Sequence, residues 1–467
     1  MVSRQISPDQ MATIELVSPN TLRPHSHHEK EQLPTNPLTI TPSEPSIQRP
    51  SLFNSPPTSP ITSFTAYPDG GIRAYTVLFG TWCALLPTSG MLTTTGSLQT
   101  HILTHQLNGR TEAEVGWIFS VYAFLFFFGG IVGGSAFDKY GLRVMLIPGS
   151  IGLVASIIIL ANCTEYYQFM LGFSILGGTS SSLIWTSTIA TIGHWFSMRR
   201  GLATGLATTA GGIGGVIFPL LLNTLIPRLG FPWSIRIIAL FSTFSCGTGI
   251  LLTSTRIPPS ISQKPLFDMT GFKDTCFSLT VAAIFLIDLA VVLPPAYLPA
   301  YALDHGYTTA SATHLLVFLN AATVLGRGLP GILADRLGRF NIMIISSTLS
   351  TLAIFLLWLL SSSSVATLIA FTLIFGIFSG TAYSLTPVCV AQLCSTEEYA
   401  TKYGTAYGIV SFATLIGNPI AGAILGGGEG KKYRELIVFC GGVYAASTVL
   451  FVLARAKGGG WKVRKTF

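Results

Sequence analysis

From residue 72 onward the chain repeats one pattern, in which apolar runs of roughly twenty residues alternate with short polar breaks. A helix of that length crosses the ~30 Å hydrocarbon core of a lipid bilayer. Prolines and glycines interrupt several runs, and membrane helices tolerate both. The pattern predicts an all-α membrane protein with twelve transmembrane helices, at residues 74–97, 115–136, 144–162, 168–192, 202–226, 233–254, 275–300, 311–333, 340–361, 366–391, 404–427 and 434–455.

Residues 1–66 have a different composition and contain 11 of the 26 prolines, with many serines and threonines. Such a segment buries too little apolar surface to order itself, so we expect a disordered tail. Its Ser-Pro and Thr-Pro steps leave regulation by phosphorylation open. No apolar core follows a basic start here, so the first predicted helix is expected to act as its own insertion signal.

Composition excludes several classes of protein. Charged residues make up 10% of the chain and mean hydropathy is +0.58, whereas soluble domains carry about 25% charged residues. The net charge of +8 does not indicate nucleic-acid binding, because the charges form short clusters between apolar runs. Seven scattered cysteines form no CxxC pair, so we expect no metal and no other cofactor.

The distribution of basic residues predicts the topology. Loops on one side carry Lys139, Arg143, Arg199, Arg200, Arg256, Lys264, Lys273, Arg336, Arg339 and Lys402, whereas the other side holds chiefly Arg110, Arg228, Lys431, Lys432 and Arg434. The positive-inside rule then places both termini in the cytoplasm. We expect six-helix bundles at 67–254 and 275–455, a central cytoplasmic loop at 255–274 and a basic tail at 456–467. The plasma membrane is the expected location, with an internal membrane as the alternative.

A motif recurs in the loops after the second and eighth predicted helices. The two copies keep the same spacing of glycine, acid, base and glycine, at Gly134, Asp138, Lys139, Gly141 and Arg143 and again at Gly331, Asp335, Arg336, Gly338 and Arg339. A second repeat has two glycines at four-residue spacing, with Gly201 and Gly205 corresponding to Gly404 and Gly408. Matching elements at matching places indicate an internal duplication, from which carriers build two domains around a central path.

The residue types of this motif have a physical reason. Glycines let two helices approach closely and allow a tight turn between them. An acid near a helix end can form a contact with a neighbouring helix in one conformational state and lose it in the other. The plainer alternative is a charged hairpin that only marks the cytoplasmic side.

The repeated G-x-x-x-D-[RK]-x-G loop resembles the signature loop of the major facilitator superfamily, and the resemblance spans residues 72–455. It implies a major facilitator fold, in which two six-helix bundles rock around a substrate site at the membrane midplane. Two further segments resemble the monocarboxylate-porter branch, especially its fungal members. They contain Asp69, Gly70, Gly71 and Arg73, and then Trp195, Phe196, Arg199, Arg200, Gly201 and Gly205.

The chain departs from that branch at two positions. Well-studied animal members carry a lysine in the first helix and an aspartate four residues before the arginine of the eighth. Here the first helix has no lysine in its apolar part, and Thr323 stands four residues before Arg327. The resemblance therefore does not extend to a proton-coupled lactate mechanism.

Two ionisable residues inside predicted spans are candidates for binding and coupling, because charges are costly in a membrane and usually face the pathway. Arg327 could hold a carboxylate through two hydrogen bonds, and Asp288 could carry a proton. Each could instead tie helices together. Counting along the helices offsets the two by roughly 10 Å, so a shared water or substrate is expected rather than a direct pair. Asn320, Tyr297 and Asn418 are further candidate cavity residues, with Asn418-Pro419 expected to break its helix or only to kink it.

The sequence predicts a secondary transporter for a small organic anion or related metabolite, with protons as the candidate coupling ion. It contains no phosphate-binding loop of an ATPase. Export of a secondary metabolite is the alternative. A non-transporting nutrient sensor and a polytopic enzyme are more remote, and no catalytic cluster indicates an enzyme. The expected partners are the bilayer, a small substrate and protons, whereas the oligomeric state is left open.

Overall fold

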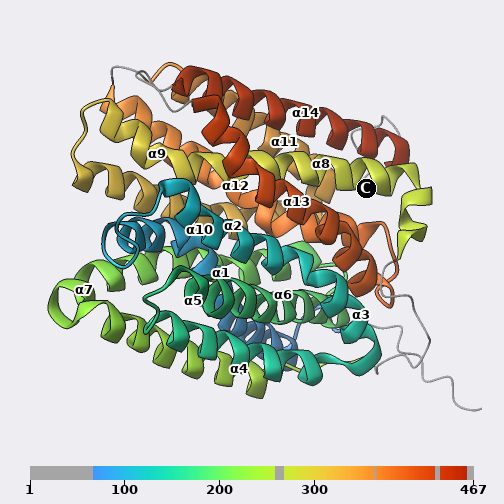
Figure 1. Cartoon of the computed structure of the whole chain (residues 1–467). Helices are drawn as coiled ribbons and strands as arrows, with labels where there is room; N and C mark the ends of the chain where they lie inside the picture. Colours follow the sequence, from blue (N-terminus) through green and yellow to red (C-terminus); the bar gives the residue numbers. More distant parts are fainter. Residues whose placement is uncertain (1–66, 258–267, 362–363, 426–431, 460–467) are drawn as a thin grey trace, which may run out of the picture. The chain divides into compact units, whose positions relative to one another are not determined.

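The computed structural model describes residues 67–257, 268–361, 364–425 and 432–459. In these ranges every regular element is a helix (Figure 1), which confirms the predicted all-α class. The predicted disordered tail and half of the central loop, residues 258–267, lie outside the described residues. The predicted basic tail begins inside a helix, because the last helix continues to Gly459.

The first group, which we call the N-terminal helices, ends at residue 252. It comprises α1 (Ile72–Thr104), α2 (Glu112–Phe128), α3 (Gly130–Tyr140), α4 (Leu142–Leu160), α5 (Tyr166–Gln168), the π-helix η1 (Phe169–Ile175), α6 (Leu176–Trp195) and α7 (Arg200–Leu252). The C-terminal helices follow a short 3₁₀ turn, η2 (Met269–Lys273). They comprise α8 (Thr275–Val291), α9 (Leu293–Asp304), α10 (Thr309–Leu337), α11 (Arg339–Ala353), the π-helix η3 (Ile354–Trp358), α12 (Val365–Gln392), α13 (Tyr399–Leu425) and α14 (Tyr433–Gly459).

The predicted runs coincide with these helices, although two runs share one element. The runs at 202–226 and 233–254 both lie in α7, which bends at Gly230. Gly230 has a φ of 77°, a backbone conformation open chiefly to glycine, and prolines flank it at 227 and 232. The seventh run, by contrast, is divided between two helices, since α8 ends at Val291 and α9 begins at Leu293, just before Pro294.

Nine helical stretches of the described chain are long and apolar enough to cross a membrane, with α2 and α3, α8 and α9, and α11 and η3 each counted as one stretch. The helices α1 and α6 do not meet this measure because they are rich in serine, threonine and glycine. Their hydroxyl groups are nevertheless largely buried inside the protein and bonded to carbonyls of their own helix, as when Thr88 donates to Leu85 and Ser187 to Leu183. Their polar residues therefore do not have to face lipid.

The outward surface carries large apolar side chains that are mostly exposed. On α7, for example, Leu240, Phe244 and Leu251 are 72%, 78% and 84% exposed. Water-soluble proteins rarely expose contiguous apolar surface of this kind. The exposed surface therefore fits hydrocarbon, which agrees with a membrane-embedded protein.

The helices cluster as one compact unit. Within it α1 packs along α7, α10 along α12, and α8 along α14. Contacts between the N-terminal and C-terminal helices are made mainly by three pairs of helices: α10 lies against α7, and α13 lies against α2 and against α3 (Figure 1). The division into two six-helix bundles stays a prediction.

Candidate transport site and gate

Arg327 lies on α10 with only 3% of its side chain surface exposed. Its Nη1 donates a hydrogen bond to the carbonyl of Thr208 on α7 at 2.9 Å. Its guanidinium also lies 4.6 Å from the ring centroid of Tyr383 on α12. Nε has no hydrogen-bond partner within the described chain. Arg327 is thus held in place by two neighbouring helices while keeping a donor for another ligand.

Asp288 lies on α8 and is also buried. Its Oδ2 has no hydrogen-bond partner in the part of the chain that the structure describes. The carboxyl group is within electrostatic range of Tyr383 and of Tyr403 and Tyr407 on α13. No ion pair joins Asp288 to Arg327 among the described residues, so each remains available to a further partner.

The three polar candidates are placed differently. Asn320, on α10 seven residues before Arg327, donates from Nδ2 to the carbonyl of Gly215 at 3.3 Å. The hydroxyl of Tyr297 on α9 donates to the carbonyl of Asn418 at 3.1 Å, so these two predicted residues do meet. The expected helix break at Asn418 is wrong: α13 continues through Pro419 to Leu425, with the Asn418 side-chain oxygen unpartnered. Packing against neighbouring helices offsets the proline there.

A column of tyrosines, which sequence reasoning missed, lines α13 beside these groups. Tyr399, Tyr403 and Tyr407 follow at four-residue spacing, with ring centroids 5.4 Å and 4.4 Å apart. Trp185 of α6 donates to the Tyr403 hydroxyl at 2.9 Å, which ties the column to the N-terminal helices. The four-residue spacing was the available signal, because residues i and i+4 share one helix face.

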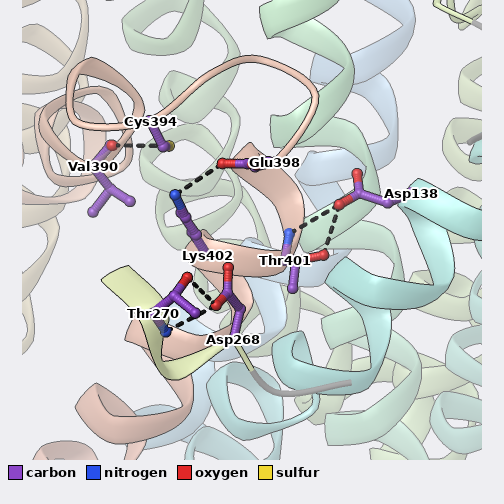
Figure 2. Close-up of polar contacts among 8 residues, drawn as sticks. All are labelled: Asp138, Asp268, Thr270, Val390, Cys394, Glu398, Thr401 and Lys402. Carbon is purple, nitrogen blue, oxygen red and sulfur yellow. Dashed lines mark hydrogen bonds and ion pairs between the residues drawn. The ribbon is translucent and has the colours of Figure 1, made fainter. Parts of the chain in front are cut away.

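The two motif acids bind the first amides of two long helices. Asp335, near the end of α10, accepts hydrogen bonds from the backbone N–H groups of Gly201 and Leu202 at 2.9 Å and 2.8 Å, at the start of α7. Asp138, near the end of α3, accepts from the amide and hydroxyl of Thr401 at 3.3 Å and 2.7 Å, at the start of α13 (Figure 2). A carboxylate at a helix N-terminus satisfies unpaired amides and complements the helix dipole.

Both bonds join an N-terminal helix to a C-terminal one. We call the end of the helices where Asp138 and Asp335 lie the loop face. The loop face is closed in this structure, because α7 and α13 each begin in contact with the other group of helices. The state-dependent role of these acids stays a prediction.

The motif glycines allow backbone contact at the same places. A Cβ on Gly134 would lie 2.1 Å from the carbonyl oxygen of Ala400, and one on Gly331 would lie 2.4 Å from that of Gly201. Only a residue without a side chain fits so close to a neighbouring backbone. Gly201 therefore corresponds to Ala400.

The predicted alignment of Gly201 and Gly205 with Gly404 and Gly408 is wrong by one helical turn. A Cβ on Gly205 would lie 2.5 Å from the carbonyl oxygen of Arg327, and one on Gly404 would lie 2.1 Å from that of Gly130. Gly205 thus corresponds to Gly404, and not to Gly408 as the spacing suggested. The error arose because glycines recur every four residues on both helices, so several registers match equally well.

The remaining motif residues shape the two loops. Gly141 and Gly338 have φ values of 83° and 96° and end α3 and α10. Arg339 donates from Nη2 to the carbonyl of Ser197 at 2.9 Å and lies 3.9 Å from the Asp335 carboxylate. The Lys139 ammonium lies 5.1 Å from the Tyr140 ring, whereas Arg143 and Arg336 are exposed.

The two segments that carry the narrower resemblance contact each other at the loop face. Asp69 accepts hydrogen bonds from the amides of Ser197 and Arg199 at 2.7 Å and 3.2 Å. The Arg73 guanidinium lies 5.8 Å from the Trp195 ring. Further contacts place Gly70 near the Arg199 side chain, Phe196 edge-on to Tyr75, and Gly71 at the start of α1 with a φ of 88°.

Replacing Asp335 by asparagine is expected to loosen the loop face. Asparagine has no charge and only one acceptor oxygen for the two backbone N–H groups that Asp335 binds. The change is worth about 1–2 kcal/mol, or roughly five- to thirtyfold in the equilibrium between the closed and open states of the loop face. Buried Cys389 on α12, within electrostatic range of Arg339, can report opening when the other six cysteines are replaced by serine. Its rate of maleimide labelling should rise, whereas Asp304→Asn at the exposed end of α9 should leave it unchanged. Equal rates in both variants would contradict this role for Asp335.

Comparison with known proteins supports one family. The family model described as Major Facilitator Superfamily matches residues 77–348 and 309–466. The chain is 31% identical over 420 residues to a riboflavin transporter of Saccharomyces cerevisiae, covering 85% of this chain and 81% of the relative. It is 33% identical over 396 residues to an aspyridones efflux protein of Emericella nidulans, covering 84% and 80%.

Solved structures agree on the fold. The human organic anion transporter MFSD10 aligns with a TM-score of 0.64 at 15% identity, covering 82% of this chain and all of that one. The transporter FucP in its outward conformation aligns with a TM-score of 0.63 at 16% identity, covering 82% of this chain and 99% of that one. At such identities the likeness concerns the fold alone.

Proposed function

The chain belongs to the major facilitator superfamily, and from this premise we propose that it is a secondary carrier for a small organic anion that binds at Arg327. It is a transmembrane transporter and not an enzyme. The observation that carries the proposal is the guanidinium of Arg327, which is buried, fixed by Thr208 and Tyr383, and still holds an unpartnered Nε. An arginine of this kind suits a carboxylate, because its planar donors match the two oxygens.

Asp288 is the proposed coupling residue. It is a buried carboxyl group with an unpartnered oxygen and no basic partner among the described residues. A charge left in this position is costly, and binding a proton removes the cost. Uptake of an anion together with a proton would then move no net charge. Asn320, Tyr297 and Asn418 are proposed to line the same path.

We further propose that two six-helix bundles, residues 67–254 and 275–455, rock against each other and open the loop face and its opposite in turn. The loop face is taken as cytoplasmic because the basic loops gather there. The start of α1 and the end of α14 lie at this face. The amide of Asp69, just before α1, donates to the Trp195 carbonyl, and Arg455 in the last turns of α14 contacts Asn341. Both termini would then be cytoplasmic, in a plasma membrane protein.

Export of a secondary metabolite is the second candidate. The relative named for aspyridones efflux favours it, and the riboflavin transporter favours a ring-containing substrate. Uptake of labelled lactate, benzoate and riboflavin into proteoliposomes, with and without a pH gradient, tests these candidates. Transport of benzoate or lactate supports the anion carrier, transport of riboflavin alone would contradict it, and no transport of any would contradict both.

Replacing Asp288 by asparagine is expected to remove the stimulation of uptake by a pH gradient. The amide keeps the size of the side chain but cannot take up and release a proton. Uptake without a gradient should fall less than the gradient-driven rate, which should drop at least about tenfold if Asp288 carries the proton. Asp304→Asn is the matched control. Unchanged pH dependence in Asp288→Asn would contradict the coupling role.

A further inference from the structure

Arg200 is the first residue of α7, and its side chain is buried at the closed loop face with 6% of its surface exposed. Its guanidinium carbon lies 4.2 Å from the ring centroid of Tyr399, the first residue of α13. A cation over an aromatic face at this distance is attracted to it, most strongly when water is excluded. The contact joins the N-terminal helices to the C-terminal ones.

The two residues occupy corresponding positions in the duplicated fold. Gly201 meets Gly331 as Ala400 meets Gly134, and the amides of Leu202 and Thr401 both bind a motif carboxylate. Position 200 therefore corresponds to position 399. The duplication placed a cation in one copy and an aromatic ring in the other, and the two side chains meet where the helix starts converge.

Among the residues that the structure describes, the guanidinium of Arg200 has no anionic partner. Its Nη2 is buried without a hydrogen bond, and no ion pair to Arg200 occurs within the described chain. Gly193 of α6 leaves the room that it occupies, because a Cβ there would lie 2.7 Å from Nη2. A buried charge is costly unless it is paired. The Tyr399 ring offsets part of this cost, and a carboxylate would offset more.

We propose that Arg200 is a second anion-binding residue of this carrier, which Tyr399 covers while the loop face is closed and which a carboxylate occupies when it opens. The inference rests on the proposed function in one respect, namely that the substrate is an anion. Arg200 would then form a site at the loop face that is distinct from Arg327. The anion would occupy this site when it enters or leaves the carrier through the loop face.

Arg200 is buried beneath the Tyr399 ring and the converging helix starts while the loop face is closed, so its edge donors are out of reach from the loop side. An anion that binds there from the loop side must favour the open state by the ratio of its affinities for the two states. The Tyr399 hydroxyl also donates to the carbonyl of Pro387 at 3.2 Å, beside the contact of the ring with Arg200. A carboxylate offered from the loop side therefore acts as a ligand that opens this face.

The test uses purified protein in nanodiscs with Cys389 as the single cysteine, so no identified substrate is needed. The probe is benzoate, and benzamide is the neutral control of the same shape. Benzoate is expected to raise the maleimide labelling rate of Cys389 in the parent protein by about fivefold or more, and benzamide is not. Without ligand, Arg200→Gln and Tyr399→Leu should both raise the basal rate, whereas Tyr399→Phe keeps the ring and should stay close to the parent.

The decisive comparison is between the two arginines. Arg200→Gln should abolish the response to benzoate, whereas Arg327→Gln should retain it. A response that survives in Arg200→Gln, or none in the parent protein, would overturn the inference. If Arg200→Gln does not fold, Arg200→Lys takes its place and should show a higher basal rate with a weaker response. The proposed function fails separately, when Arg327→Gln transports as well as the parent.

Discussion

Replacing Arg327 by glutamine is expected to abolish uptake of an anionic substrate while the protein still folds and inserts. Removing one partner of a buried charged pair costs about 2–5 kcal/mol, which is roughly 30-fold to several thousandfold in affinity. Arg327→Lys keeps the charge but loses the planar contact with the Tyr383 ring and the pair of donors. It should therefore recover only a small part of the activity. Initial rates of benzoate or lactate uptake measure the effect.

A structural role for Arg327 gives a different result. If the side chain only ties α10 to α7 through its bond to Thr208, thermal stability should fall in parallel with transport, and lysine should restore both. Arg236→Gln is the matched control, because Arg236 is on α7 and bonds Asn162 at the surface. Full uptake with an unchanged KM in Arg327→Gln would contradict the proposed substrate site.

Replacing Gly134 by alanine is expected to prevent the loop face from closing. The added Cβ would lie 2.1 Å from the carbonyl oxygen of Ala400, and a backbone atom cannot rotate away as a flexible side chain can. Separation of α3 from α13 is then required. Because the transport cycle needs the closed state, uptake should fall by at least about fivefold, as overpacking costs of 1–3 kcal/mol imply.

The same variant should label rapidly at Cys389, since the loop face would stay open. Gly404→Ala should behave alike, because its Cβ would lie 2.1 Å from the carbonyl of Gly130. Gly247→Ala on α7 is the control, as no atom lies within 4 Å of its added Cβ. Slow labelling together with normal uptake in Gly134→Ala would show that the closed contact is not required.

The elements that the sequence predicted well depend on local signals. The positions of the helices follow from the lengths of the apolar runs. The loops that contain Asp138 and Asp335 follow from the spacing of glycine, acid, base and glycine, which occurs in two copies. The contacts of these acids with Thr401 and Leu202 were not predictable in detail, because they join segments far apart in the chain. The register of Gly205 against Gly404 was mistaken for the same reason, since periodic glycines give no unique alignment.

The candidate site shows the same limit. Arg327 and Asp288 stood out because charges inside apolar runs are rare. The partner of Arg327, Tyr383, and the partner of Arg200, Tyr399, did not stand out, because buried tyrosines are common in helices and only packing tells which of them faces a cation. The helix break expected at Asn418 failed because α13, packed against neighbouring helices, continues through Pro419.

The central claim is that the chain is a carrier whose site opens to one side at a time, and counterflow tests it most directly. Proteoliposomes loaded with unlabelled benzoate or lactate are diluted into a trace of the labelled compound, with no ion gradient. A carrier should accumulate label transiently above its equilibrium level, and Arg327→Gln should not. Label that only rises to equilibrium, at the same rate in both proteins, would contradict the account.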